Sequence, residues 1–109
     1  MNLPEKLLPL IDQFYVECAE DYVGLWMLVG DVRRAIPDGN SAQVMSYTIE
    51  ILDGLLTSKK IVAGNFSEDK EFCQWKNSTI DTLERIREEW VALGRDPTIG
   101  EIVWFTVIE

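Results

Sequence analysis

The stretch from Ser41 to Phe66 constrains the fold most, because it predicts one long amphipathic helix followed by a short strand. Ser41 supplies a hydroxyl suited to cap the first free N–H groups of this helix. Residues 61–66 follow the helix and predict the strand. The apolar side of the helix carries, at helical spacing, Val44, Thr48, Ile51, Leu52, Leu55 and Leu56. The opposite, polar side carries Gln43, Ser46, Glu50, Asp53 and Thr57.

Two further helices are predicted ahead of this one, over residues 4–20 and 22–36. Asp21 is expected to cap the second of them. Gly24 and Gly30 fall inside that second helix, where we expect them to let another helix approach closely. A strong turn signal at residues 37–40 then separates it from the central helix.

A hairpin and one more helix are predicted beyond the central helix. Residues 67–71 form a polar turn, and residues 72–75 alternate as a short return strand. Ser78 is expected to cap the next helix, which Gly94 ends. The apolar side of this helix is predicted to carry Ile80, Leu83, Ile86 or Arg87, Trp90 and Val91. Residues 102–108 are β-branched and aromatic and predict a final strand, although Thr98 with Glu101 also fits the start of a short helix.

These elements predict an α+β fold that is mainly helical, with a small antiparallel sheet made of residues 61–66, 72–75 and 102–108. Residues 1–109 are expected to form one domain. A chain of this length buries roughly two-thirds of its unfolded surface, which is enough for a core without metal or disulfide. The expected core residues are Ile11, Phe14, Leu28, Val32, Ile51, Leu52, Leu55, Leu83 and Trp90.

The composition limits the classes of partner and the cellular location that we expect for the protein. The formal net charge is −9, from 19 acidic against 10 basic residues. This balance disfavours nucleic acid as a partner and favours a basic protein. An equally weighted alternative is that the acidic charge only keeps the protein soluble. No basic start with a long apolar run marks a signal peptide, and no apolar run is long enough to span a membrane. We therefore expect a cytoplasmic protein with no membrane partner.

The inventory of reactive side chains predicts a protein that is not an enzyme. The chain has no histidine, which is the commonest general base and a common metal ligand. Cys18 lies on an apolar stripe and Cys73 in a predicted strand, so neither has the surroundings of an activated thiol. Residues 69–71, Asp-Lys-Glu, are similar to the carboxylate–lysine sets of metal nucleases, but they fall in an exposed turn. No metal or other cofactor is predicted.

The order helix, turn, long helix and hairpin between Tyr22 and Trp75 resembles the winged helix-turn-helix architecture. The matching passages are Asp31-Val32-Arg33-Arg34, Ile51 to Leu56 and Ile61-Val62-Ala63-Gly64. The C-terminal part, with Glu89-Trp90, Leu93-Gly94-Arg95-Asp96-Pro97 and Gly100 to Phe105, looks like small bacterial proteins of similar size. As a small, strongly acidic chain without a catalytic motif, the whole sequence resembles bacterial antitoxins and toxin-immunity proteins. The winged-helix resemblance implies binding of either DNA or protein.

Charge weighs against the DNA-binding alternative. A recognition helix presents Arg, Lys, Asn or Gln to bases and cations to phosphates. The polar side of the central helix offers Glu50 and Asp53, with Gln43 as the one reader of bases. Four cations could still gather in space, although nearby acids are expected to balance them: Arg33, Arg34, Lys59 and Lys60.

We therefore predict a non-enzymatic, acidic binding protein that neutralises a basic protein, with a bacterial toxin of nuclease activity as the expected partner. Its carboxylates would take the place of the phosphates that a basic nuclease groove binds. The alternative is a winged-helix transcriptional regulator that binds DNA. The predicted contact residues are Glu50, Asp53, Glu68, Asp69, Glu71 and Trp75, the last as an aromatic anchor at the end of the hairpin. The sequence predicts no oligomeric state.

Overall fold

A computed structural model describes residues 3–107 of the chain. Its helices are a short 3-10 turn at Glu5–Leu7, α1 (Leu8–Glu20), α2 (Leu25–Ala35), α3 (Ser41–Thr57) and α4 (Thr79–Leu93). Its strands are β1 (Val23–Gly24), β2 (Ile61–Phe66), β3 (Phe72–Gln74) and β4 (Trp104–Val107). This confirms the mainly helical α+β class. Within residues 3–107, no helix has both the length and the apolar character needed to cross a membrane.

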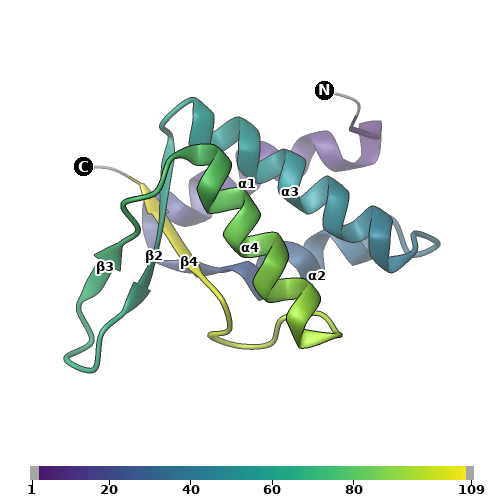
Figure 1. The fold of residues 1–109 in the computed structure, drawn as a ribbon. Helices are drawn as coiled ribbons and strands as arrows, with labels where there is room; N and C mark the ends of the chain where they lie inside the picture. Colours follow the sequence, from purple (N-terminus) through teal and green to yellow (C-terminus); the bar gives the residue numbers. More distant parts are fainter. Residues whose placement is uncertain (1–2, 108–109) are drawn as a thin grey trace.

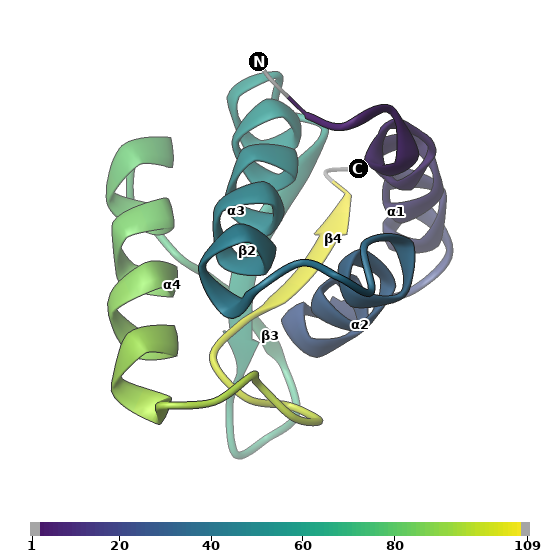
Figure 2. The same ribbon diagram turned by 90° about the vertical axis from the view of Figure 1, so that its right-hand side faces the viewer.

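The four strands form one antiparallel sheet in the order β1-β4-β2-β3. The helices lie against one face of this sheet, which we call the inner face (Figures 1 and 2). The last strand of the chain thus runs between β1 and β2, while the β2–β3 hairpin extends past the helices (Figure 1). Strand β1, which the sequence analysis placed inside a helix, pairs with β4 through Val23↔Phe105 and Gly24↔Trp104.

The core lies between the helices and the inner face of the sheet. Seven of the nine predicted core residues are buried there: Phe14, Leu28, Val32, Ile51, Leu52, Leu55 and Trp90. Ile11 and Leu83 are only half-buried and pack against the margin of the core. Strand β4 adds Phe105, which is fully buried with its ring centroid 5.7 Å from that of Phe14.

The second predicted helix begins later than expected. Its first residue is Leu25, preceded by Gly24 as N-cap, because Val23 and Gly24 pair with β4 instead. The Asp21 carboxylate accepts a hydrogen bond from the N–H of Tyr22 (2.7 Å) and does not cap α2. The prediction for the two glycines was also wrong. Gly24 lies in β1, and a Cβ on Gly30 would meet only the guanidinium of Arg34, at 3.5 Å or more.

Helix α3 keeps its predicted phase but is capped one residue earlier. Asn40 is the N-cap, since its side chain accepts from the Gln43 N–H (2.8 Å) while the Gln43 side chain accepts from the Asn40 N–H (2.9 Å). These two bonds form a reciprocal capping box. Ser41, the predicted cap, is the first residue of the helix and its hydroxyl accepts from Arg33.

Helix α4 has the predicted ends but a different buried side. Ser78 caps it by accepting from the Asp81 N–H, and Gly94 ends it with φ +68°. The side chains buried along the helix are Thr82, Ile86 and Trp90, at steps of four. Ile80 and Val91 were predicted on the apolar side but are 71% and 63% exposed. At about 100° per residue they fall on the opposite side from the buried three.

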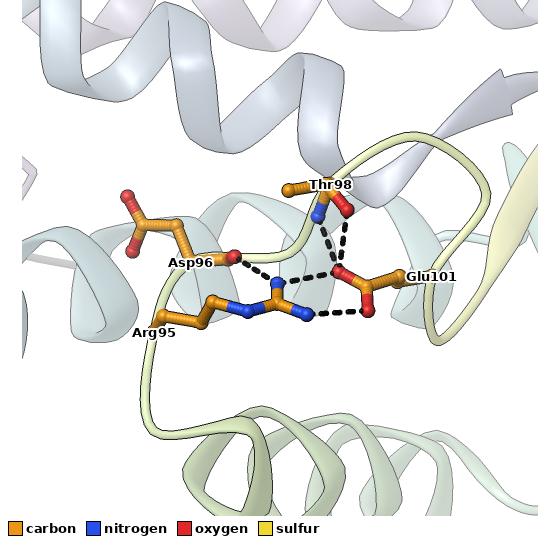
Figure 3. Close-up of polar contacts among 4 residues, drawn as sticks. All are labelled: Arg95, Asp96, Thr98 and Glu101. Carbon is orange, nitrogen blue, oxygen red and sulfur yellow. Dashed lines mark hydrogen bonds and ion pairs between the residues drawn. The ribbon is translucent and has the colours of Figure 1, made fainter.

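A hydrogen-bonded loop carries the chain from α4 to β4 (Figure 3). The Arg95 guanidinium donates two bonds to the Glu101 carboxylate (2.7 and 2.9 Å), which also accepts from the N–H and hydroxyl of Thr98. Thr98 and Glu101 thus close a turn and do not begin a helix. The final strand is shorter than predicted, since it begins at Trp104; Ile108 lies outside the described residues.

Candidate functional site

The sheet presents an aromatic surface on the face away from the helices. Side chains alternate between the two faces of a strand. Because Phe105 points into the core, its neighbour Trp104 points to the outer face. Trp104 pairs with Gly24 on one side and Gly64 on the other, so neither neighbouring strand places a side chain directly beside its indole.

Other aromatic rings fill the space above these glycines. The Trp104 ring lies 5.0 Å from Trp26 and 5.3 Å from Phe66, measured between centroids. The Phe66 ring in turn lies 5.7 Å from Phe72, and Tyr22 lies 5.0 Å from both phenylalanines. Four of these five contacts are edge-to-face, a geometry that stabilises aromatic pairs beyond their buried area. We call Tyr22, Trp26, Phe66, Phe72 and Trp104 the outer aromatic face.

The outer aromatic face is separate from the hydrophobic core. None of its five residues belongs to the core cluster or packs against it. Tyr22 is 41% exposed and Phe66 is 37% exposed, while the other three are half-buried by one another. An apolar cluster that is ordered by its own contacts and still meets solvent is typical of a binding surface.

The glycines beneath the rings hold this surface close to the sheet. A Cβ on Gly64 would lie 2.4 Å from the carbonyl oxygen of Cys73 and 2.6 Å from the Phe72 ring. A Cβ on Gly24 would lie 1.6 Å from the Trp26 ring. The rings therefore rest directly on the backbone, which fixes their positions on the sheet.

An acidic turn borders the outer aromatic face. It runs from Ser67 to Glu71, between Phe66 and Phe72, and all five of its residues are exposed. The backbone N–H of Ser67 bonds to the Glu71 carbonyl (2.8 Å), and the N–H of Lys70 bonds to the Ser67 carbonyl (2.9 Å). Its three acids and one lysine give a net charge of −2. Among residues 3–107, Glu68, Asp69 and Glu71 take part in no ion pair.

The structure divides the predicted contact residues among separate places. Glu68, Asp69 and Glu71 lie together in the acidic turn, whereas Glu50 and Asp53 belong to α3. Helix α3 and the tip of the β2–β3 hairpin are separate parts of the fold (Figure 1). Asp53 is exposed and accepts from the Thr57 hydroxyl (2.9 Å), and Glu50 is half-buried. The polar side of α3 is thus a second acidic surface, distinct from the turn.

Trp75, the predicted anchor, is engaged within the protein. Its indole N–H donates to the Asn65 side chain (2.5 Å), and the guanidinium of Arg85 lies 3.7 Å from its ring centroid. Arg85 also donates to Glu89 (2.8 Å). Trp75 is half-buried against the core, so these contacts leave it less available than Tyr22 or Phe66.

Sequence reasoning missed the five residues of the outer aromatic face. One local signal was present: the adjacent Trp104 and Phe105 in a predicted strand must point to opposite faces. The decisive facts were not local, since the partners Gly24 and Gly64 are set by the strand order.

The four cations considered for DNA binding do not gather. Arg33 pairs with Asp96 and Arg34 with Asp31. Arg33 also bonds to Ser41 at the start of α3, whereas Lys59 and Lys60 follow its end. A helix of 17 residues is about 25 Å long at 1.5 Å per residue, which separates the two pairs of cations.

Neither cysteine is placed for nucleophilic chemistry. Burial, with a smaller effect from the charge of Glu17, raises the pKa of Cys18 to about 12, so its thiol stays protonated at neutral pH. Cys73 is exposed on the edge strand, where its Sγ donates to the Glu71 carbonyl (3.7 Å). Within the described part of the chain, no three side chains of His, Cys, Asp or Glu gather to hold a metal ion.

Comparison of the chain with models of protein families, with curated proteins and with solved structures finds no match.

Proposed function

We propose that the protein binds a basic protein partner and blocks it, and that the outer aromatic face and the acidic turn form the contact surface. One observation carries this proposal: a preorganised cluster of five rings borders three carboxylates that have no ion pair among residues 3–107. Aromatic side chains dominate the binding energy of many interfaces, and charges at the rim steer association.

A toxin with nuclease activity is the partner class that we propose. A nuclease groove is basic because it binds phosphates, so an acidic protein reaches it quickly and competes for its cations. The net charge of −9 supports the same role at long range. The alternative, a regulator that binds DNA, has less support, because Arg33 and Arg34 already pair with acids and the lysines lie at the other end of α3.

The test is a binding titration against the product of the neighbouring gene at about 10 and 150 mM salt, where the Debye length falls from roughly 30 to 8 Å. The variant Glu68→Lys/Asp69→Lys is expected to slow association roughly tenfold at low salt. The variant Glu50→Lys/Asp53→Lys is the matched control, since it makes the same change of net charge on α3.

Three results would change this conclusion. A larger effect of the α3 variant would move the interface to the polar side of that helix. Equal effects of the two variants would mean that only the total charge matters. Absence of binding, together with tight, salt-sensitive binding to a specific DNA duplex, would favour the regulator.

A further inference from the structure

We infer that the outer aromatic face and the acidic turn receive arginine side chains, so that the partner presents an arginine-bearing segment to this surface. The inference rests on the proposed function and adds the chemistry of the contact. It starts from the exposed rings of Tyr22 and Phe66 and from the carboxylates of the acidic turn, which begins right after Phe66.

The protein contains the same kind of contact within itself. The Arg85 guanidinium lies over the Trp75 ring, 3.7 Å from its centroid, while its Nε donates to the Glu89 carboxylate (2.8 Å). One planar cation thus meets an aromatic ring and a carboxylate at once. The outer aromatic face supplies rings, and the acidic turn that joins Phe66 to Phe72 supplies carboxylates. Among the described residues, no arginine of this chain forms an ion pair with those carboxylates.

Charge complementarity favours a cation, and the rings favour arginine over lysine. A guanidinium is planar and weakly hydrated, so it stacks on aromatic rings and also binds carboxylates through two parallel bonds. A lysine ammonium is compact and strongly hydrated, and it acts mainly as a point charge. Lys70, the cation of the turn itself, lies among the three acids and leaves them a net negative charge.

The experiment uses two capped peptides of equal charge, Gly-Arg-Gly-Arg-Gly and Gly-Lys-Gly-Lys-Gly, titrated into the full chain and followed by amide NMR shifts. The arginine peptide is expected to bind about two- to fivefold more tightly, from the contribution of an exposed cation–π contact. The largest shifts are expected at Tyr22, Phe66, Trp104 and the acidic turn.

Phe66→Leu keeps an apolar side chain but removes the ring, so it should abolish the preference for arginine. Tyr15→Leu is the matched control, because Tyr15 has the same 37% exposure but lies on α1, where its ring already faces Lys60 at 5.5 Å. Tyr22→Leu repeats the test if the NMR spectrum shows that Phe66→Leu is not folded.

The inference would be overturned if the two peptides bound with equal affinity or if neither peptide caused a shift. It would also be overturned if the preference for arginine survived both Phe66→Leu and Tyr22→Leu. The partner titration described above separates this failure from failure of the proposed function. A partner that binds through the acidic turn without preferring arginine would leave the proposed function in place.

Discussion

Trp104 and Phe105 are consecutive residues of β4, and their side chains lie on opposite faces of the sheet. The Phe105 ring packs edge-to-face against Phe14 in the core, whereas the Trp104 ring packs against Trp26 and Phe66 outside it. One strand at the centre of the sheet therefore supports both the folding core and the candidate binding surface.

This division predicts different effects for two neighbouring substitutions. Phe105→Ala is expected to lower the free energy of unfolding by about 3–5 kcal/mol, because it empties a fully buried site. Trp104→Ala should cost less stability, since its indole is half-exposed, but should weaken partner binding more than any α3 substitution. Urea denaturation and the partner titration measure the two effects. An equal loss of stability from both variants would contradict the assignment of faces.

A second prediction concerns the backbone beneath the rings. Gly64→Ala is expected to lower the free energy of unfolding by about 1–3 kcal/mol, because its Cβ would overlap the Cys73 carbonyl, which cannot move without disturbing the sheet. Gly30→Ala is the control: it lies inside α2, where its Cβ would make only an ordinary contact with the Arg34 guanidinium (3.5 Å), and it should stabilise the protein by about 0.5–1 kcal/mol. Thermal or urea unfolding gives the change in unfolding free energy of both variants. An unchanged unfolding free energy for Gly64→Ala would show that the rings do not rest on the strand.

A third prediction concerns the start of α3. Asn40→Ala is expected to cost about 0.5–2 kcal/mol, because it leaves the Gln43 N–H without its acceptor. Ser41→Ala should cost less than about 0.5 kcal/mol, since it removes only an exposed contact with Arg33. Urea denaturation measures both losses of unfolding free energy. A larger loss for Ser41→Ala than for Asn40→Ala would identify Ser41 as the cap.

Features that depend on local sequence were predictable. The phase of α3, the cap at Ser78 and the stop at Gly94 follow from residues within one or two helical turns. The buried side of α4 was harder, because Ile80 and Val91 are apolar but Thr82 is the residue that the core encloses. Apolar character alone did not settle which side faces inward.

Features that depend on distant pairing were not predictable. Val23 and Gly24 form a strand only because residues about 80 positions later pair with them. The outer aromatic face could not be predicted for the same reason, since the strand order brings Tyr22 and Trp26 to the other three rings, those of Phe66, Phe72 and Trp104. For the same reason the sequence grouped Glu50 and Asp53 with the acids of the turn, although they lie on separate elements.

A fourth prediction is a pH dependence at the loop of Figure 3. Hydrogen bonds from Arg95, and then from Thr98, lower the pKa of Glu101 to about 2 from its ordinary value of 4.5. The folded state thus keeps this carboxylate charged where the unfolded chain protonates it. Its contribution to stability is complete above about pH 4.5 and is lost as the pH falls toward 2.

Urea denaturation between pH 2 and pH 6 tests this prediction. The difference in unfolding free energy between the wild type and Glu101→Gln should be largest near pH 6 and should shrink toward pH 2. Glu88→Gln is the control, since Glu88 takes part in no ion pair of the described residues. A difference that stays constant over this range would show that the Arg95–Glu101 contact does not hold the carboxylate charged.

The last prediction uses the two cysteines to locate the partner. Cys73 is exposed, whereas Cys18 is buried with its pKa raised to about 12, so a maleimide at neutral pH should modify Cys73 alone. By strand alternation the Cys73 side chain points away from the outer face, to which Phe72 and Gln74 belong. A bulky label on Cys73 should therefore leave partner binding nearly unchanged.

The same label on Gln74→Cys, made together with Cys73→Ser, should block binding, because it would stand beside Gly64 on the outer face. The two labels are one residue apart and of equal size, so the contrast reports the face and not the neighbourhood. Loss of binding with the Cys73 label, or none with the label at position 74, would place the partner elsewhere on the protein.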